Sequence, residues 1–63
     1  MELKWNSYRV TFETETTDVA TTVFALHADA AEPMALDQIA QDLNIDTRIL
    51  YYLTTELIDE DVL

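Results

Sequence analysis

The 63-residue sequence contains no cysteine, no glycine and a single histidine, His27. Without cysteine the chain can form neither a disulfide nor a thiolate metal site. The absence of glycine excludes the glycine-rich loops that cradle nucleotide phosphates. Ser7 is the only serine, and no other side chain pairs with His27 in a pattern typical of nucleophilic catalysis. We therefore expect no enzymatic activity, no cofactor and no metal site.

Basic residues are also scarce, since three Lys and Arg face 13 Asp and Glu and the formal net charge is −10. The composition is nevertheless 49% hydrophobic, which is typical of a chain that folds. Such an acidic shell is found in proteins of salt-adapted (halophilic) organisms and in acidic phage or plasmid inhibitors, and both sources remain open. Repulsion between like charges should destabilise the folded chain at low salt.

Long hydrophobic runs are absent, because none exceeds the five residues from Ile49 to Leu53. Nothing here is long enough to span a membrane, and the N-terminus lacks the pattern of a signal peptide. We expect one domain, residues 1–63, in a cytoplasmic protein.

The N-terminal part, residues 3–13, is predicted to be a strand. Tyr8, Val10 and Phe12 alternate with polar residues, which is the period of a half-buried strand. Trp5 lies on the opposite parity, so the phase changes at Asn6-Ser7 and a bend or bulge is expected there.

Helical spacing dominates the remainder of the chain. A first helix is predicted for about residues 18–29, and Pro33 should prevent its continuation. A second helix is predicted for residues 36–43, followed by Asn44 in a left-handed conformation. Asp46 is a natural N-cap for a third helix over about residues 47–59. The buried stripes of the last two helices should pack together: Leu36, Ile39 and Leu43 against Ile49, Leu53 and Leu57.

Residues 33–63 read PMALDQIAQDLNIDTRILYYLTTELIDEDVL, and this stretch resembles the core of a winged helix-turn-helix domain. In that superfamily a short helix, here LDQIAQDL, is joined by a tight turn, here Asn44-Ile45-Asp46, to a recognition helix. The resemblance implies an α+β fold: an N-terminal strand plus a three-helix, winged-helix-like helix-turn-helix. The wing would be absent or truncated, because the chain stops at Leu63, where Val62-Leu63 should start a strand.

The resemblance implies a small regulator that acts on transcription or another DNA transaction, as a dimer or within an assembly. The residues expected to contact DNA or a partner are Thr47, Arg48, Tyr51, Tyr52 and Thr55. Only Arg48 among them is basic, although duplex binding depends mainly on Lys and Arg contacts to phosphates.

The alternative is an acidic protein-interaction module that binds a protein partner rather than DNA. It would dock through Trp5, Tyr8 and the Tyr51-Tyr52 face, and one version is an inhibitor that imitates DNA phosphates. A homodimer through the N-terminal strand is a further expectation. The sequence leaves both functions open.

Overall fold

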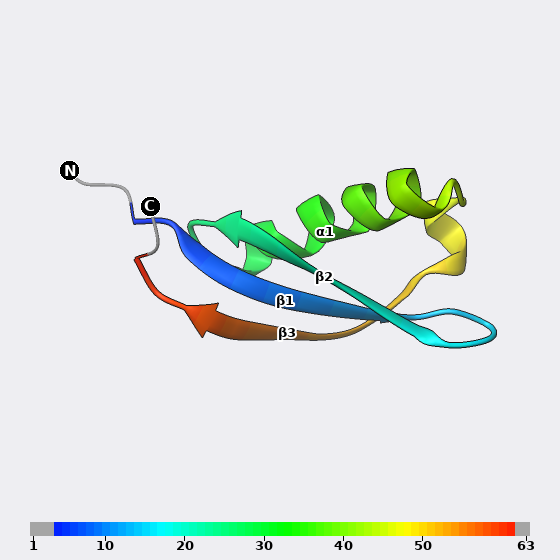
Figure 1. Ribbon diagram of the computed structural model, residues 1–63, viewed down its shortest axis with the longest axis horizontal. Helices are drawn as coiled ribbons and strands as arrows, with labels where there is room; N and C mark the ends of the chain where they lie inside the picture. The colour runs from blue at the N-terminus through cyan, green and yellow to red at the C-terminus, as the bar shows by residue number, and fades with distance from the viewer. Residues whose placement is uncertain (1–3, 62–63) are drawn as a thin grey trace.

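A computed structural model describes residues 4–61 and shows a three-stranded antiparallel sheet with one long helix. The elements follow the order β1 (Asn6–Glu13), β2 (Asp18–Ala25), α1 (Ala28–Leu43), a short 3-10 helix (Thr47–Ile49) and β3 (Tyr51–Asp59) (Figure 1). The strand order is β2-β1-β3, so the N-terminal strand is central. The α+β class is as expected, but the three-helix helix-turn-helix prediction is wrong.

The strand predicted at the N-terminus is present as β1, and its inward side chains Tyr8, Val10 and Phe12 are buried. β2 pairs with β1 in an unbroken register from Asn6 opposite Ala25 to Glu13 opposite Asp18. The glycine-free turn between them is closed by threonine. The hydroxyl of Thr14 donates to the carbonyl of Thr17 (2.6 Å), and the Thr17 N–H donates back to Thr14 Oγ1 (3.1 Å).

The helix predicted for residues 18–29 is therefore wrong, since Asp18–Ala25 forms β2. This segment contains several β-branched residues, which lose side-chain freedom in a helix and pack well on a sheet. Val23 and Ala25 point inward and are buried, whereas Phe24 between them is exposed. The same apolar residues fit a helical stripe, so the spacing of apolar residues alone did not distinguish a helix from a strand.

The predicted helix 36–43 is the second half of a longer helix, α1, which begins at Ala28. Pro33 lies inside α1 and does not interrupt it, so the helix boundary predicted there is wrong. Alanine has the highest helix propensity and is frequent around Pro33. The fully buried Ala31 and Ala35 also allow the helix to approach the sheet closely. The predicted left-handed Asn44 is confirmed, with φ 55° and ψ 51°.

The third predicted helix, residues 47–59, is also wrong. Asp46 is an N-cap, as predicted, and its carboxylate accepts a hydrogen bond from the Arg48 N–H (2.9 Å). The helix that it caps is only the 3-10 turn Thr47–Ile49, after which the chain extends into β3. β1 has a second edge that needs a hydrogen-bonding partner, and the aromatic and β-branched residues of β3 suit a strand.

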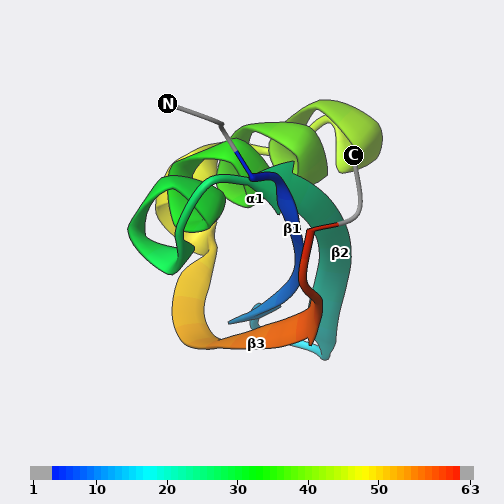
Figure 2. The ribbon, with the colours of Figure 1, turned by 90° about the vertical axis from the view of Figure 1, so that its left-hand side faces the viewer.

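The core lies between α1 and one face of the sheet (Figure 2). Its buried hydrophobic side chains are Tyr8, Val10, Phe12, Val23, Ala25, Ala31, Ala35, Ile39 and Leu50. Of the six side chains predicted to pack between two helices, Ile39 is buried and Leu36 is partly buried against the core. The other four, Leu43, Ile49, Leu53 and Leu57, are exposed. The predicted strand at Val62-Leu63 lies outside the described residues.

Candidate interaction surface

β3 is an edge strand in the part of the chain that the structure describes. It pairs with β1 on one side, and no described strand lies on its other side. An edge of this kind presents backbone N–H and C=O groups that can pair with another chain. β2 is the edge strand on the opposite side of the sheet.

The side chains of β3 are unusually apolar for an exposed strand. All of its residues are exposed except Thr55, which is half-buried. Large hydrophobic side chains with 40% to 64% exposure make up more than half of the strand: Tyr51, Tyr52, Leu53, Leu57 and Ile58. We call these five residues the β3 apolar row.

Cross-strand pairs show why two members of this row, Tyr52 and Leu57, are uncovered. Tyr52 pairs with Phe12 and Leu57 pairs with Tyr8, and residues that pair directly share one face of a sheet. Phe12 and Tyr8 are 2% and 8% exposed, but Tyr52 and Leu57 are 47% and 48% exposed. The cause is the position of α1, which packs mainly against β2 and leaves the helix-side face of β3 open (Figure 2).

Two irregularities in the β1–β3 pairing divide the edge. The register skips Leu53 and Ile58, neither of which has a direct partner on β1. The predicted bulge near Asn6-Ser7 corresponds to the shift between Ser7 and Tyr8, although the extra residue belongs to β3. Bulges twist a strand and limit how far it can pair. The regular part of the edge is therefore short, with apolar side chains at both of its ends.

Tyr52 is held in place before any partner binds. Its ring meets the buried ring of Phe12 edge-to-face, with centroids 6.1 Å apart and an interplanar angle of 72°. Its hydroxyl is hydrogen-bonded to the Thr55 hydroxyl at 2.8 Å. Both contacts restrict the side chain, which lowers the entropy lost on binding.

Arg48 is engaged with Asp46 rather than with the β3 surface. Its guanidinium donates to both carboxylate oxygens, with an Nη2–Oδ2 distance of 2.7 Å. These hydrogen bonds hold the pKa of Asp46 below its usual value and raise the pKa of Arg48.

The residues predicted to form one recognition helix lie on two different elements. Thr47 and Arg48 are in the 3-10 helix, while Tyr51, Tyr52 and Thr55 are on β3.

Of the N-terminal pair of predicted partner contacts, Tyr8 is buried in the core and Trp5 is partly buried. β1 has β2 and β3 on its two edges, so the expected homodimer through this strand has no free edge to use.

Sequence reasoning missed Leu53, Leu57 and Ile58 as surface residues. Leu53 and Leu57 were assigned to a buried helical stripe because they are four residues apart. The neighbouring tyrosines, threonines and Ile58 favour a strand, and this preference was the available signal.

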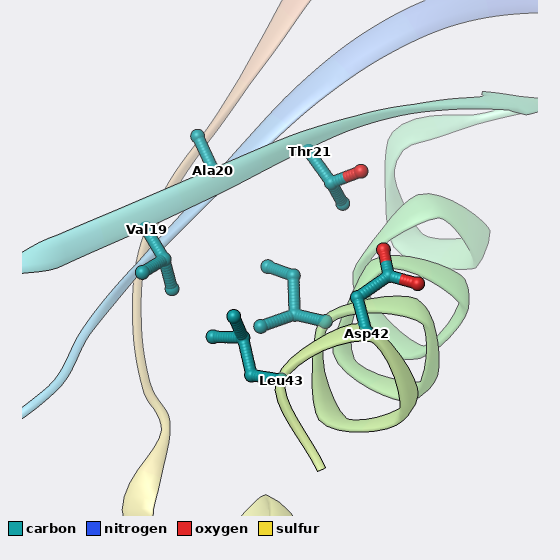
Figure 3. Close-up of a pocket in the computed structure, with 6 residues that line it drawn as sticks. Val19, Ala20, Thr21, Asp42 and Leu43 are labelled. Carbon is teal, nitrogen blue, oxygen red and sulfur yellow. The ribbon is translucent and has the colours of Figure 1, made fainter. Parts of the chain in front are cut away.

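A second candidate lies where β2 meets the last turn of α1 (Figure 3). Val19 and Thr21 point from β2 toward Asp42 and Leu43, whereas Ala20 points away. The cavity has a volume of about 270 Å³ and is lined mainly by apolar groups. Asp42 is the one carboxylate in its lining, and His27 is at the opposite end of α1.

No protein family, curated protein or solved structure matches the chain. Residues 4–61 contain no cluster of three or more side chains able to hold a metal ion. Their one long helix, α1, is neither long nor apolar enough to cross a bilayer. Among the described residues, the free edge of β3 with its apolar row is therefore the strongest candidate for a binding surface.

Proposed function

We propose that this chain is a small, acidic, cytoplasmic protein-interaction module that binds a partner by strand addition to β3. An extended segment of the partner would hydrogen-bond to the free edge and cover the apolar row. The observation that carries this proposal is the difference in exposure between paired residues of β1 and β3. Phe12 is 2% exposed and its neighbour Tyr52 is 47% exposed on the same face.

The bulges make the edge suitable for a specific partner rather than for indefinite sheet growth. They leave a short regular stretch, Thr54 to Leu57, between Leu53 and Ile58, and pairing with a partner segment of ordinary strand length can be centred on this stretch. Glu56 within this stretch, and Asp59 just beyond it, discourage the stacking of identical edges. Affinity would come from the backbone hydrogen bonds together with burial of the apolar row.

A protein partner is favoured over duplex DNA by the surroundings of the basic residues. The segment expected to read DNA is a strand for most of its length, and Arg48 is bound to Asp46. DNA binding requires several Lys and Arg contacts to phosphate, and the net charge of −10 opposes them. An inhibitor that imitates DNA phosphates would depend on charge alone, whereas strand addition uses a defined edge.

Selection from a peptide library tests the proposal without a known partner. Random peptides of about 12 residues, twice an average strand length, are selected on the immobilised full chain. The Leu53→Thr/Ile58→Thr variant removes two apolar side chains that have no partner on β1 and retains strand propensity. Phe24→Thr is the matched control, because Phe24 is an exposed apolar residue on the opposite edge strand.

We expect selected peptides to lose affinity by about tenfold or more with Leu53→Thr/Ile58→Thr and little with Phe24→Thr. Amide NMR shifts on binding should concentrate on β3. Equal binding to both variants, or no enriched peptide, overturns the proposal. Duplex DNA that binds at low salt, with affinity falling as salt rises, would restore the regulator hypothesis.

A further inference from the structure

We infer that the β3 edge takes a cationic segment, whose Lys or Arg residues lie beside the C-terminal end of β3. This inference rests on the proposed function and names the chemistry of the partner. The segment combines apolar side chains that cover the apolar row with basic side chains at one end only.

The charge on this surface is confined to one end. Residues 51–55 carry no charge, whereas the next six residues include four acids, all of them exposed: Glu56, Asp59, Glu60 and Asp61. The ion pair between described residues is that of Arg48 with Asp46, so these four carboxylates form none. A bound strand would therefore meet an uncharged apolar half followed by an acidic half.

The acidic end is held close to the sheet. The N–H of Asp61 donates to Asn6 Oδ1 at 3.0 Å, and Asn6 is the first residue of β1. This contact keeps the chain beside the sheet, at the start of β1, after β3 ends.

Charge complementarity also decides against a second copy of this chain. Two copies would bring net charges of −10 together at an edge that already carries four acids. Repulsion between the two net charges opposes the dimer. Each lysine or arginine of a basic segment instead attracts the acidic end of β3.

Antiparallel pairing, the commoner arrangement, fixes the order of the partner sequence. The N-terminal end of the partner then lies beside the C-terminal end of β3. Basic residues should come first in the segment, and alternating apolar residues should follow opposite Tyr51, Tyr52 and Leu53.

Three synthetic peptides test the charge and its position. The first has two lysines followed by alternating valine and threonine, the second carries the lysines at the other end, and the third has glutamates in place of the lysines. Each is titrated into the full chain at low and high salt by calorimetry and amide NMR. The Glu60→Gln/Asp61→Asn variant removes two charges beside β3, and Glu15→Gln/Asp37→Asn removes two exposed charges elsewhere.

We expect the lysine-first peptide to bind roughly tenfold tighter than the glutamate peptide, because exposed ion pairs contribute modestly. The advantage should shrink as salt screens the charges. Glu60→Gln/Asp61→Asn should reduce it, whereas Glu15→Gln/Asp37→Asn should not.

Equal affinity for lysine and glutamate peptides overturns the inference. If both peptides still lose affinity with Leu53→Thr/Ile58→Thr, the proposed function survives while the cationic partner does not. Tightest binding by the peptide with lysines last overturns the antiparallel placement. A dimer in sedimentation equilibrium that Leu53→Thr/Ile58→Thr dissociates shows a second copy on the edge and also overturns the inference.

Discussion

Asp46 and Arg48 show how much of a structure two nearby residues can set. One carboxylate caps the 3-10 turn through the Arg48 N–H and also binds the guanidinium of the same residue. Both side chains are largely exposed, at 47% and 87%, so the pair adds little to stability. The pair fixes the turn that leads into β3, and it keeps the guanidinium of Arg48 bound to the Asp46 carboxylate.

The pKa of Asp46 provides a test at this scale. We expect an NMR titration to place it below 3.8, and Arg48→Gln to bring it back toward that value, because the side-chain hydrogen bonds from Arg48 lower it. Since the folded pKa is depressed, the stabilising contribution is present above the unfolded value and is lost as the pH falls through the folded pKa. An unchanged pKa in Arg48→Gln would show that the guanidinium is not engaged.

Whole elements are decided by competition between helix and strand. β2 and β3 both contain apolar residues spaced for a helix, yet each is a strand because β1 has two edges that need partners. α1 is helical because alanine outweighs the interruption at Pro33. Proline has no N–H, so the carbonyl of Asp29, four residues earlier, cannot receive the usual helical hydrogen bond.

Pro33→Ala should therefore stabilise the domain. A restored hydrogen bond and a better helix former are expected to add about 1–3 kcal/mol to the free energy of unfolding. Urea denaturation followed by circular dichroism measures the change. Glu32→Ala is the control, since it alters the neighbouring residue without restoring a hydrogen bond. A loss of stability in Pro33→Ala would mean that the proline relieves a constraint in the first half of α1.

The folded molecule combines a small hydrophobic core with a large net negative charge. A domain of this length buries only about 60% of the surface of its unfolded chain, which leaves a narrow margin of stability. Among residues 4–61 nine hydrophobic residues are buried, and the whole chain carries a net charge of −10. Folding brings these charges closer together, and their repulsion subtracts from the margin.

Sodium chloride should raise the melting temperature, because the Debye length falls from about 10 Å at 0.1 M to about 3 Å at 1 M. The Glu15→Gln/Asp37→Asn variant, with two charges fewer, should melt at a higher temperature at low salt and respond less to added salt. Scanning calorimetry across the salt range measures both. A melting temperature that stays constant or decreases with salt would show that repulsion does not limit stability.

Sequence alone determined the features that depend on neighbouring residues. The alternation of Tyr8, Val10 and Phe12 gave the strand β1, and Asn44 and Asp46 were placed correctly as a left-handed residue and a cap. Each of these follows from backbone geometry or from a hydrogen bond within a few residues. The acidic charge was equally visible in the sequence.

The tertiary structure decided the state of residues 18–25 and 51–59, and with it the candidate surface. Apolar residues in these segments satisfy helical spacing, but a strand cannot exist alone, and β1 supplies the hydrogen bonds that make both segments strands. The exposure of Tyr52 and Leu57 depends on where α1 lies over the sheet. No local pattern encodes that position, because it results from packing between residues far apart in the chain.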